Sequence, residues 1–431
     1  MTSRKVVLMA GLLAGVVGLT GCGSDDDSGS NNNNNNNGQT PTVVRVSGAI
    51  TSNTTWTSNN SYLLQGAVFV RAGATLTIQA GTTVVGERSS LGTLVIDRGA
   101  RIVAQGTETN PIVMTSERPA GQRRRGDWGG LIINGAAPLN VPGGEKVGEG
   151  DTGRFGGSNP NDDSGILRYV RVEFAGIEFS PDNELNGVAF QGTGAATICD
   201  HIQVTFNQDD GFEWFGGTTA CKYLVSTANG DDSFDWTDGW QGRGQFWVAQ
   251  QKGDEADAGF ESDNLAGSVD AQPRSSPTIY NVTLIGAPGT QDGTGSTNGM
   301  VLRVGTGGEL RNFIVLGFKR AGVDVRDASI TQANNGGLTF RNAIVHGNGT
   351  GTILGATGWL ADATVSQENP LLGDPYNLAA PNWQPSATGP ARSGAIPPAT
   401  PPNDGFFEPA NFIGAIGSTD WTRGWTTSAQ N

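Results

Sequence analysis

One short phrase is written three times in the middle of the chain, and it limits the possible folds more than any other feature. The copies read DDGFEW from Asp209, DDSFDW from Asp231 and DAGFES from Asp257. Their phenylalanines are 22 and then 26 residues apart (234 − 212 and 260 − 234). Repetition at this period is typical of a solenoid, in which each copy forms part of one coil stacked on the next.

A second phrase recurs around and beyond these copies and supplies another strand to each coil. It occupies residues 166–175, 198–207, 220–229, 280–286, 311–317 and 341–347. The strands alternate in a fixed order, and no segment between them has the pattern of a crossover helix. We therefore predict an all-β, single-stranded right-handed parallel β-helix over residues 43–368. A β-propeller is the alternative, but its regular blade spacing is absent.

The repeats also predict which residues stack on one another. The inward position should be held by Val188, Phe212, Phe234, Phe260, Met300 and Val323. One corner should be held by Tyr169, His201, Tyr223, Asn281, Asn312 and Asn342, where we expect the asparagine amides to bond the coils above and below. His201 and His346 are assigned structural roles.

The cysteines of the body occupy equivalent positions in adjacent coils. Stacking would place the Cα atoms of Cys199 and Cys221 about one inter-strand spacing, roughly 4.8 Å, apart. A disulfide accepts that distance. We favour a disulfide over a pair of stacked free thiols.

The N-terminus has the pattern of an export signal. Residues 1–21 combine a basic start with a short apolar run, and they end in Leu-Thr-Gly before Cys22. This stretch resembles a bacterial lipobox, which implies cleavage before Cys22 and acylation there, palmitate included. A simple secretory peptide is the alternative. The Asn-rich residues 22–42 are expected to form a disordered tether, and Gly23 favours outer-membrane sorting.

The C-terminal part has a different composition. Residues 369–431 are rich in proline and end in an aromatic segment. We expect an extended wrap without strands, followed by an aromatic cap over one end of the β-helix.

The charge balance limits the partners. The chain has 27 Lys and Arg against 41 Asp and Glu, a net charge of −14. Such a body repels nucleic acid and suits cations or neutral ligands.

Stacking in register would place carboxylates directly opposite one another. The two expected columns are Glu213, Asp235 and Glu261, and Asp209, Asp231 and Asp257. Like charges in such columns must protonate, gain cationic partners or bind a metal. Hard oxygen ligands suit Ca²⁺, so these six residues are the candidate metal ligands. The alternative is a solvent-facing column neutralised by Lys222, Arg243 and Lys252.

Aromatic residues near these columns suggest a ligand site. Trp214 and Trp236 share the parity of the core phenylalanines, which predicts burial. Trp240 and Trp247, together with Arg243, are the candidate glycan-binding residues.

An enzymatic function would have to use the same face. A hydrolase would take a carboxylate pair from Asp210, Glu213, Asp232 and Asp235. A lyase would combine Ca²⁺ with Lys222, Arg243 or Lys252 as the base. The sequence contains no Walker, HExxH, CxxC or Gly-x-Ser-x-Gly motif.

Several further motifs resemble those of exported bacterial right-handed β-helix lipoproteins. They are Gly99-Ala100 to Thr107, Gly126–Leu131, Asp231–Trp236, Gly244–Trp247 and Asp420–Trp425. The resemblance implies the fold but no agreed activity. Asp209-Asp210 and Asp231-Asp232 also look like the paired aspartates of β-helical polygalacturonases, whose Gly-His-Gly and Arg-x-Lys motifs are absent.

These observations favour a lipid-anchored, non-catalytic envelope protein that binds Ca²⁺ and glycan. A polysaccharide lyase or glycoside hydrolase using the same face is the second hypothesis. A scaffold that binds another envelope protein through its flank is the third.

Overall fold

A computed structural model describes residues 41–180, 183–289 and 295–431. The predictions of a signal peptide, of lipidation at Cys22 and of a tether up to Thr40 lie outside these residues and remain predictions. Residues 41–431 form one compact unit, which is the body described below. None of its helices is long and apolar enough to span a bilayer.

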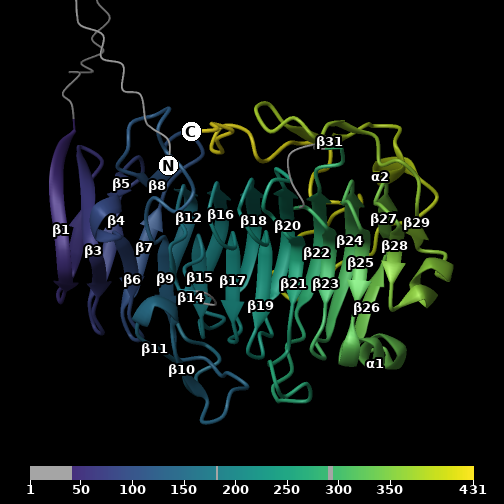
Figure 1. Ribbon diagram of the computed structural model, residues 1–431, viewed down its shortest axis with the longest axis horizontal. Coiled ribbons are helices and arrows are strands. Elements are labelled where there is room, and N and C mark those ends of the chain that lie inside the picture. The colour runs from purple at the N-terminus through teal and green to yellow at the C-terminus, as the bar shows by residue number, and fades with distance from the viewer. Residues whose placement is uncertain (1–40, 181–182, 290–294) are drawn as a thin grey trace, which may run out of the picture. The chain divides into compact units, whose positions relative to one another are not determined.

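Twenty-five strands of the body form one large sheet with parallel pairing (Figure 1). They are β1 (Thr42–Ile50), β2 (Thr54–Trp56), β3 (Asn60–Val70), β4 (Thr75–Ile78), β5 (Thr83–Gly86), β6 (Thr93–Ile96), β7 (Arg101–Gln105), β8 (Ile112–Ser116), β9 (Leu131–Asn134), β12 (Gly165–Glu173), β15 (Val188–Gln191), β16 (Ile198–Thr205), β17 (Phe212–Phe215), β18 (Ala220–Thr227), β19 (Phe234–Thr237), β20 (Arg243–Gln250), β21 (Ala258–Ser262), β22 (Thr278–Ile285), β23 (Asn298–Leu302), β24 (Gly308–Leu316), β25 (Ala321–Val325), β26 (Leu338–Arg341), β27 (Ala343–His346), β28 (Gly351–Leu354) and β29 (Val365–Ser366).

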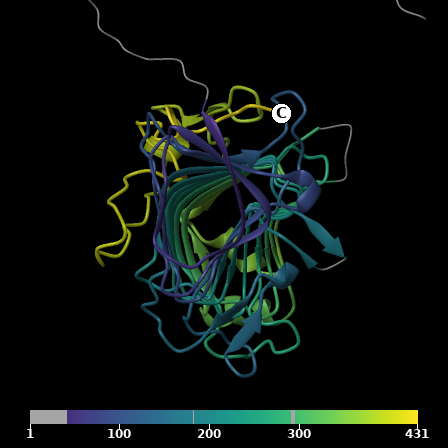
Figure 2. The same cartoon turned by 90° about the vertical axis from the view of Figure 1, so that its left-hand side faces the viewer.

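Shorter elements decorate this sheet. The antiparallel pairs are β10 (Glu145–Val147) with β11 (Arg154–Gly156), β13 (Glu178–Ser180) with β14 (Asn183–Glu184), and β30 (Leu372–Asp374) with β31 (Asn382–Pro385). The helices are η1 (Arg88–Ser90), η2 (Glu149–Asp151), α1 (Asp327–Asn335), η3 (Thr357–Ala361) and α2 (Pro390–Ser393). Viewed from the end of the body, successive coils superpose around one axis (Figure 2). The predicted all-β parallel β-helix is therefore confirmed.

The predicted inward stack is also confirmed. Phe212 opposes Phe234, Phe234 opposes Phe260, and Phe260 opposes Met300 in parallel register. Val188 extends this stack at one end and Val323 at the other. All are buried in one apolar cluster that runs along the coils. The next position along each strand therefore points away from that core.

The prediction of a glycan platform at Trp240 and Trp247 is wrong, because both side chains are 0 % exposed. Their rings lie 4.8 and 5.0 Å from the ring of Trp214, and Trp247 donates from Nε1 to the Cys221 carbonyl at 3.0 Å. Gly244 makes room for this burial, since a Cβ there would lie 2.5 Å from the Trp247 ring. The indole ring of Trp247 therefore packs in the core against Gly244 and is not available at the surface.

The two body cysteines are joined across adjacent coils. Cys199 opposes Cys221 between β16 and β18, and their Cα atoms are 4.7 Å apart within a disulfide. Both residues are buried in the apolar core. The bond therefore ties two consecutive coils from the inside.

The predicted corner ladder exists, and its asparagines bond a neighbouring coil only in part: Asn281 Oδ1 accepts from Gln245 Nε2 of the preceding coil at 3.2 Å. Tyr169, His201 and Tyr223 stack at centroid distances of 4.3 Å, and all three have positive φ. Asn281 and Asn312 continue the ladder with positive φ. Their amide nitrogens donate to carbonyls of the C-terminal segment rather than to neighbouring coils.

The C-terminal segment differs from its prediction in two ways. It contains β30 and β31, which pair because the residues between the prolines still offer backbone donors. Its aromatic end does not cap the β-helix. Trp425 packs on the flank against Val225 and Val248, whereas side chains of α1 and η3 contact the last coils of the core.

Candidate functional site

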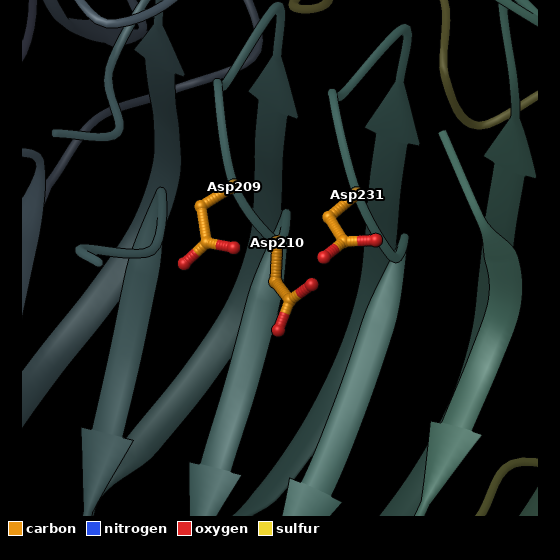
Figure 3. A group of neighbouring side chains, drawn as sticks. All are labelled: Asp209, Asp210 and Asp231. Atoms are coloured by element: carbon orange, nitrogen blue, oxygen red, sulfur yellow. The ribbon is translucent and has the colours of Figure 1, made fainter. Parts of the chain in front are cut away.

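The candidate site lies at the turns that directly precede β17 and β19, where the repeated sequence begins. The register that opposes Phe212 to Phe234 also places Asp209 and Asp231 at equivalent positions of neighbouring coils. Figure 3 shows their carboxylates at the turns, with Asp210 between them. The three residues can each offer one carboxylate oxygen within 4.8 Å of the others. We call this set the outer acidic group.

The outer acidic group borders a pocket of about 310 Å³ that opens to solvent. The pocket is lined by Glu178, Glu184, Gln208, Asp209, Gly230, Asp231 and Glu255. Asp231 is exposed, Asp209 is half-buried and Asp210 is buried. The pocket therefore gives an ion or a ligand direct access to Asp231 and Asp209, whereas Asp210 is covered.

Two further acidic groups lie deeper along the same face. Asp210, Glu213 and Asp235 form one, and Asp232, Asp235 and Glu261 form the other, each with carboxylate oxygens within 4.8 Å. The Nδ2 atom of Asn186 donates to Glu213 at 2.6 Å. The Oδ1 atom of Asp235 is buried and has no hydrogen-bond partner in the described part of the chain.

Burial raises the pKa values of several of these carboxyl groups, which favours their protonated form. It raises the pKa of Asp209 to about 8, with added repulsion from Glu184 and Asp231. It raises the pKa of Glu261 to about 7. Asp231 is exposed as a residue, yet the partial removal of its carboxylate from water at the pocket wall, with repulsion from Asp257 and Glu184, raises its pKa to about 6. The pKa values of Asp210, Glu213, Asp232 and Asp235 are raised for the same reason. Near neutral pH the face must therefore hold protons or gain cations.

The cations expected to neutralise the face lie elsewhere, so that alternative is wrong. Lys222 pairs with Glu408 at 2.6 Å, Arg243 with Asp404 at 2.6 Å and Lys252 with Asp254 at 2.8 Å. These same pairs also remove the three residues proposed as a lyase base from the acidic face. Arg243 additionally stacks under Phe406 at 4.9 Å, which occupies its guanidinium away from any glycan groove.

Two cations that the sequence reasoning missed do reach the face. Arg303 binds Glu261 and Asp263, and Lys146 lies 3.0 Å from Asp238. The repeat register could have revealed Arg303, because Leu302 opposes Ser262 and the next residue pair is Arg303 with Asp263. Lys146 lies on the β10–β11 hairpin, an irregular insertion that no repeat predicts.

The predicted metal ligands only partly coincide with the groups that the structure forms. Five of the six belong to them, but Asp257 does not; its carboxylate accepts a hydrogen bond from Thr297 Oγ1. Asp210 and Asp232, proposed for catalysis, join the groups instead. Asp210 Oδ1 accepts from the Asp232 backbone N–H at 2.9 Å, and Asp232 Oδ1 accepts from that of Ala258.

Two arginine-lined pockets adjoin the acidic pocket and share residues with it. One of about 580 Å³ contains Arg88 and Arg118 and shares Glu178 and Gln208 with the acidic pocket. The other, of about 320 Å³, is lined by Arg123, Arg124, Arg125, Phe174, Phe206, Gln208, Lys252, Glu255 and Gln430. The triple arginine is therefore more than a solvated loop. Arg125 is nearly buried and donates to the carbonyls of Ala228 and Asn229.

A comparison with protein families agrees with this architecture. Residues 48–383, more than half of the chain, match the family described as the pectate-lyase like beta helix domain. The chain belongs to this family. No curated protein and no solved structure gives a significant match.

Proposed function

We propose that the protein is a non-catalytic, calcium-dependent binder of acidic polysaccharide, anchored in the cell envelope by a lipid at Cys22. The observation that carries this proposal is the outer acidic group. Asp209, Asp210 and Asp231 converge within 4.8 Å at the mouth of a pocket lined by further carboxylates.

The donor set of this site suits Ca²⁺. The residues offer hard carboxylate oxygens, which Ca²⁺ takes in flexible sets of six to eight ligands. No Lys or Arg in the described part of the chain forms an ion pair with Asp209, Asp210 or Asp231. Asp209, Asp210 and Asp231, with Glu184 at the pocket wall, would hold the ion. Bound there, it would supply positive charge for an anionic ligand.

The surroundings favour an acidic glycan over a neutral one. The adjoining pockets contain arginines, among them the exposed Arg124, so carboxylates along a polymer could meet both calcium and a guanidinium group. Stacking of neutral sugar rings on Trp240 and Trp247 has no support, because both are buried.

The bonding of the paired aspartates supports binding rather than catalysis. Asp210 and Asp232 each spend a carboxylate oxygen on the backbone of the next coil. Both residues are also buried, which keeps their remaining oxygens from a polymer on the surface, whereas a general acid or base must reach its substrate. Family membership favours the alternative, a polysaccharide lyase or hydrolase, and the experiment below includes it.

The test is binding of polygalacturonate, alginate and a neutral glucan to the wild-type protein with calcium and with EGTA. We expect calcium-dependent retention of an acidic polymer and none of the glucan. The double variant Asp209→Asn/Asp231→Asn should lose it, whereas Asp163→Asn/Asp270→Asn, which removes two exposed carboxylates elsewhere, should not. Retention unaffected by EGTA contradicts the proposal. Release of chain fragments establishes the enzymatic alternative.

A further inference from the structure

Arg303 is the cation that enters the deeper part of the acidic face. It directly follows β23, and its guanidinium donates from Nη2 to Glu261 and from Nε to Asp263 Oδ1 at 2.9 Å. The side chain is 33 % exposed, so one side of it faces the carboxylates and the other faces solvent. This planar fork matches two carboxylates at once.

The carboxylates of the face differ sharply in how they are neutralised. Glu213, Asp235 and Glu261 stand opposite one another on three consecutive coils. Two coils beyond Glu261 the column contains Asp324, which has two arginine partners, Arg320 and Arg326. Arginine side chains therefore form ion pairs with the carboxylates of this column at Glu261 and at Asp324. No ion pair reaches Asp235 or the outer acidic group among the described residues.

Buried oxygens without a hydrogen-bond donor lie in the part of the face whose carboxylates have no arginine partner among the described residues. Asp235 Oδ1 is buried without a donor. Asn186 is 1 % exposed, its amide is turned toward Glu213, and its Oδ1 also lacks a donor among the described residues. Unpaired buried oxygens are costly, and a cation in contact with them removes that cost. At the Glu261 end of the column this cost is absent, because the Arg303 guanidinium donates hydrogen bonds to the carboxylates there.

We propose that Arg303 is a built-in cation that, through its pair with Glu261 at one edge of the group of Asp232, Asp235 and Glu261, excludes a calcium ion from that group and thereby confines calcium to the Asp209 end of the face. The inference rests on the proposed function, which it deepens by naming the residue that sets how many cations the face takes.

Removal of the arginine should therefore increase the number of calcium ions bound rather than reduce it. Without its guanidinium, Glu261 would lose the one ion-pair partner that the described residues give it, while Asp232 and Asp235 would still offer oxygens within 4.8 Å of its own. Hard oxygens crowded in this way can be neutralised by Ca²⁺. A lysine at the same position would keep a positive charge there and continue to exclude the ion.

The test is a calcium titration of the full chain by calorimetry. Relative to wild type, Arg303→Met and Arg303→Gln should each bind about one additional ion per chain, and Arg303→Lys should not. Arg320→Met is the matched control, because Asp324 keeps Arg326. Adding Glu261→Gln to Arg303→Met should restore the wild-type stoichiometry.

Thermal unfolding supplies a readout for variants that are poorly folded without calcium. We expect calcium to raise the midpoint of Arg303→Met and Arg303→Gln more than that of wild type. Unchanged stoichiometry together with an unchanged calcium response in both variants overturns the inference. Failure of wild type itself to bind calcium overturns the proposed function instead, so the two failures are distinguishable.

Discussion

Single carboxyl groups decide the electrostatics of this protein, because the fold removes them from water and places them side by side. The pKa values of Asp209, Asp231 and Glu261 are raised, because removal from water favours the neutral form of a carboxyl group. The outer acidic group tolerates this cost beside a pocket that is open to solvent. A residue kept for packing alone would not need to be acidic there.

The stability of the calcium-free protein should therefore fall as pH rises. Unfolded carboxyls lose their protons near about pH 4, whereas Asp231, Glu261 and Asp209 hold theirs to about 6, 7 and 8. Between these limits the native state binds more protons, so the slope of unfolding free energy against pH is negative. Thermal unfolding in EGTA should show a midpoint that drops from about pH 5 to about pH 8.

Calcium provides the control for this pH series. With calcium saturating, the bound ion replaces the protons, and the fall should be smaller in wild type. Carboxyls of lowered pKa, such as Asp324 and Asp404, lose their stabilising effect in a more acidic range and do not alter this window. A calcium-free midpoint that rises over the same range would contradict the burial of these groups.

The candidate site was predictable only in part from such residues. Register alone placed Glu213, Asp235 and Glu261 in one column, because a strict period fixes which residues stack. Depth was not predictable. Asp210 and Asp232 are drawn inward by bonds to the backbone of the next coil, and Asp257 turns to Thr297. Such choices depend on local donors that a repeat does not specify.

At the scale of elements, side-chain amides on the flank bind the C-terminal segment by its backbone. Gln203, Gln245 and Asn312 each accept from one backbone N–H and donate to the carbonyl of the same residue, at 2.7–2.9 Å. Their partners are Thr427, Glu408 and Ala399. The segment is therefore held largely independently of its side chains, apart from apolar anchors such as Ile413 and Trp425.

Asn312→Ala should loosen this attachment. It removes two hydrogen bonds to Ala399 and leaves an alanine at a φ of 60°, a loss of about 2–3 kcal/mol. We expect faster amide hydrogen exchange at residues 397–414. Asn342→Ala, which removes one bond to Pro397, is the control and should have a smaller effect. Equal exchange in both variants would show that the paired contact does not anchor the segment.

The elements themselves were largely predictable where the repeat is strict. Between Phe212 and Val323 an error of one residue would turn a phenylalanine outward, so register follows from the pattern. The irregular parts were not predictable. The ring of Trp247 packs against Gly244 in the core. The strands β30 and β31 pair within a Pro-rich segment, because its non-proline residues still have backbone N–H groups that can form hydrogen bonds.

At the scale of the whole molecule, the fold converts an acidic sequence into a localised field. The chain carries a net charge of −14, yet its acidic groups gather on consecutive coils while arginines line the pockets beside them. A membrane anchor at Cys22 would hold this face within reach of envelope polysaccharide. Radiolabelled palmitate incorporation, lost in Cys22→Ser, would establish the anchor.

Calcium binding by the outer acidic group is the claim on which the other proposals depend. Its most direct test is equilibrium dialysis with radioactive calcium at about pH 8, where Asp231 is ionised and Asp209 is about half ionised, comparing wild type with Asp209→Asn/Asp231→Asn. We predict saturable binding to wild type and its loss in the double variant. Absence of saturable binding to wild type, or equal binding by both proteins, would contradict the assignment of this site.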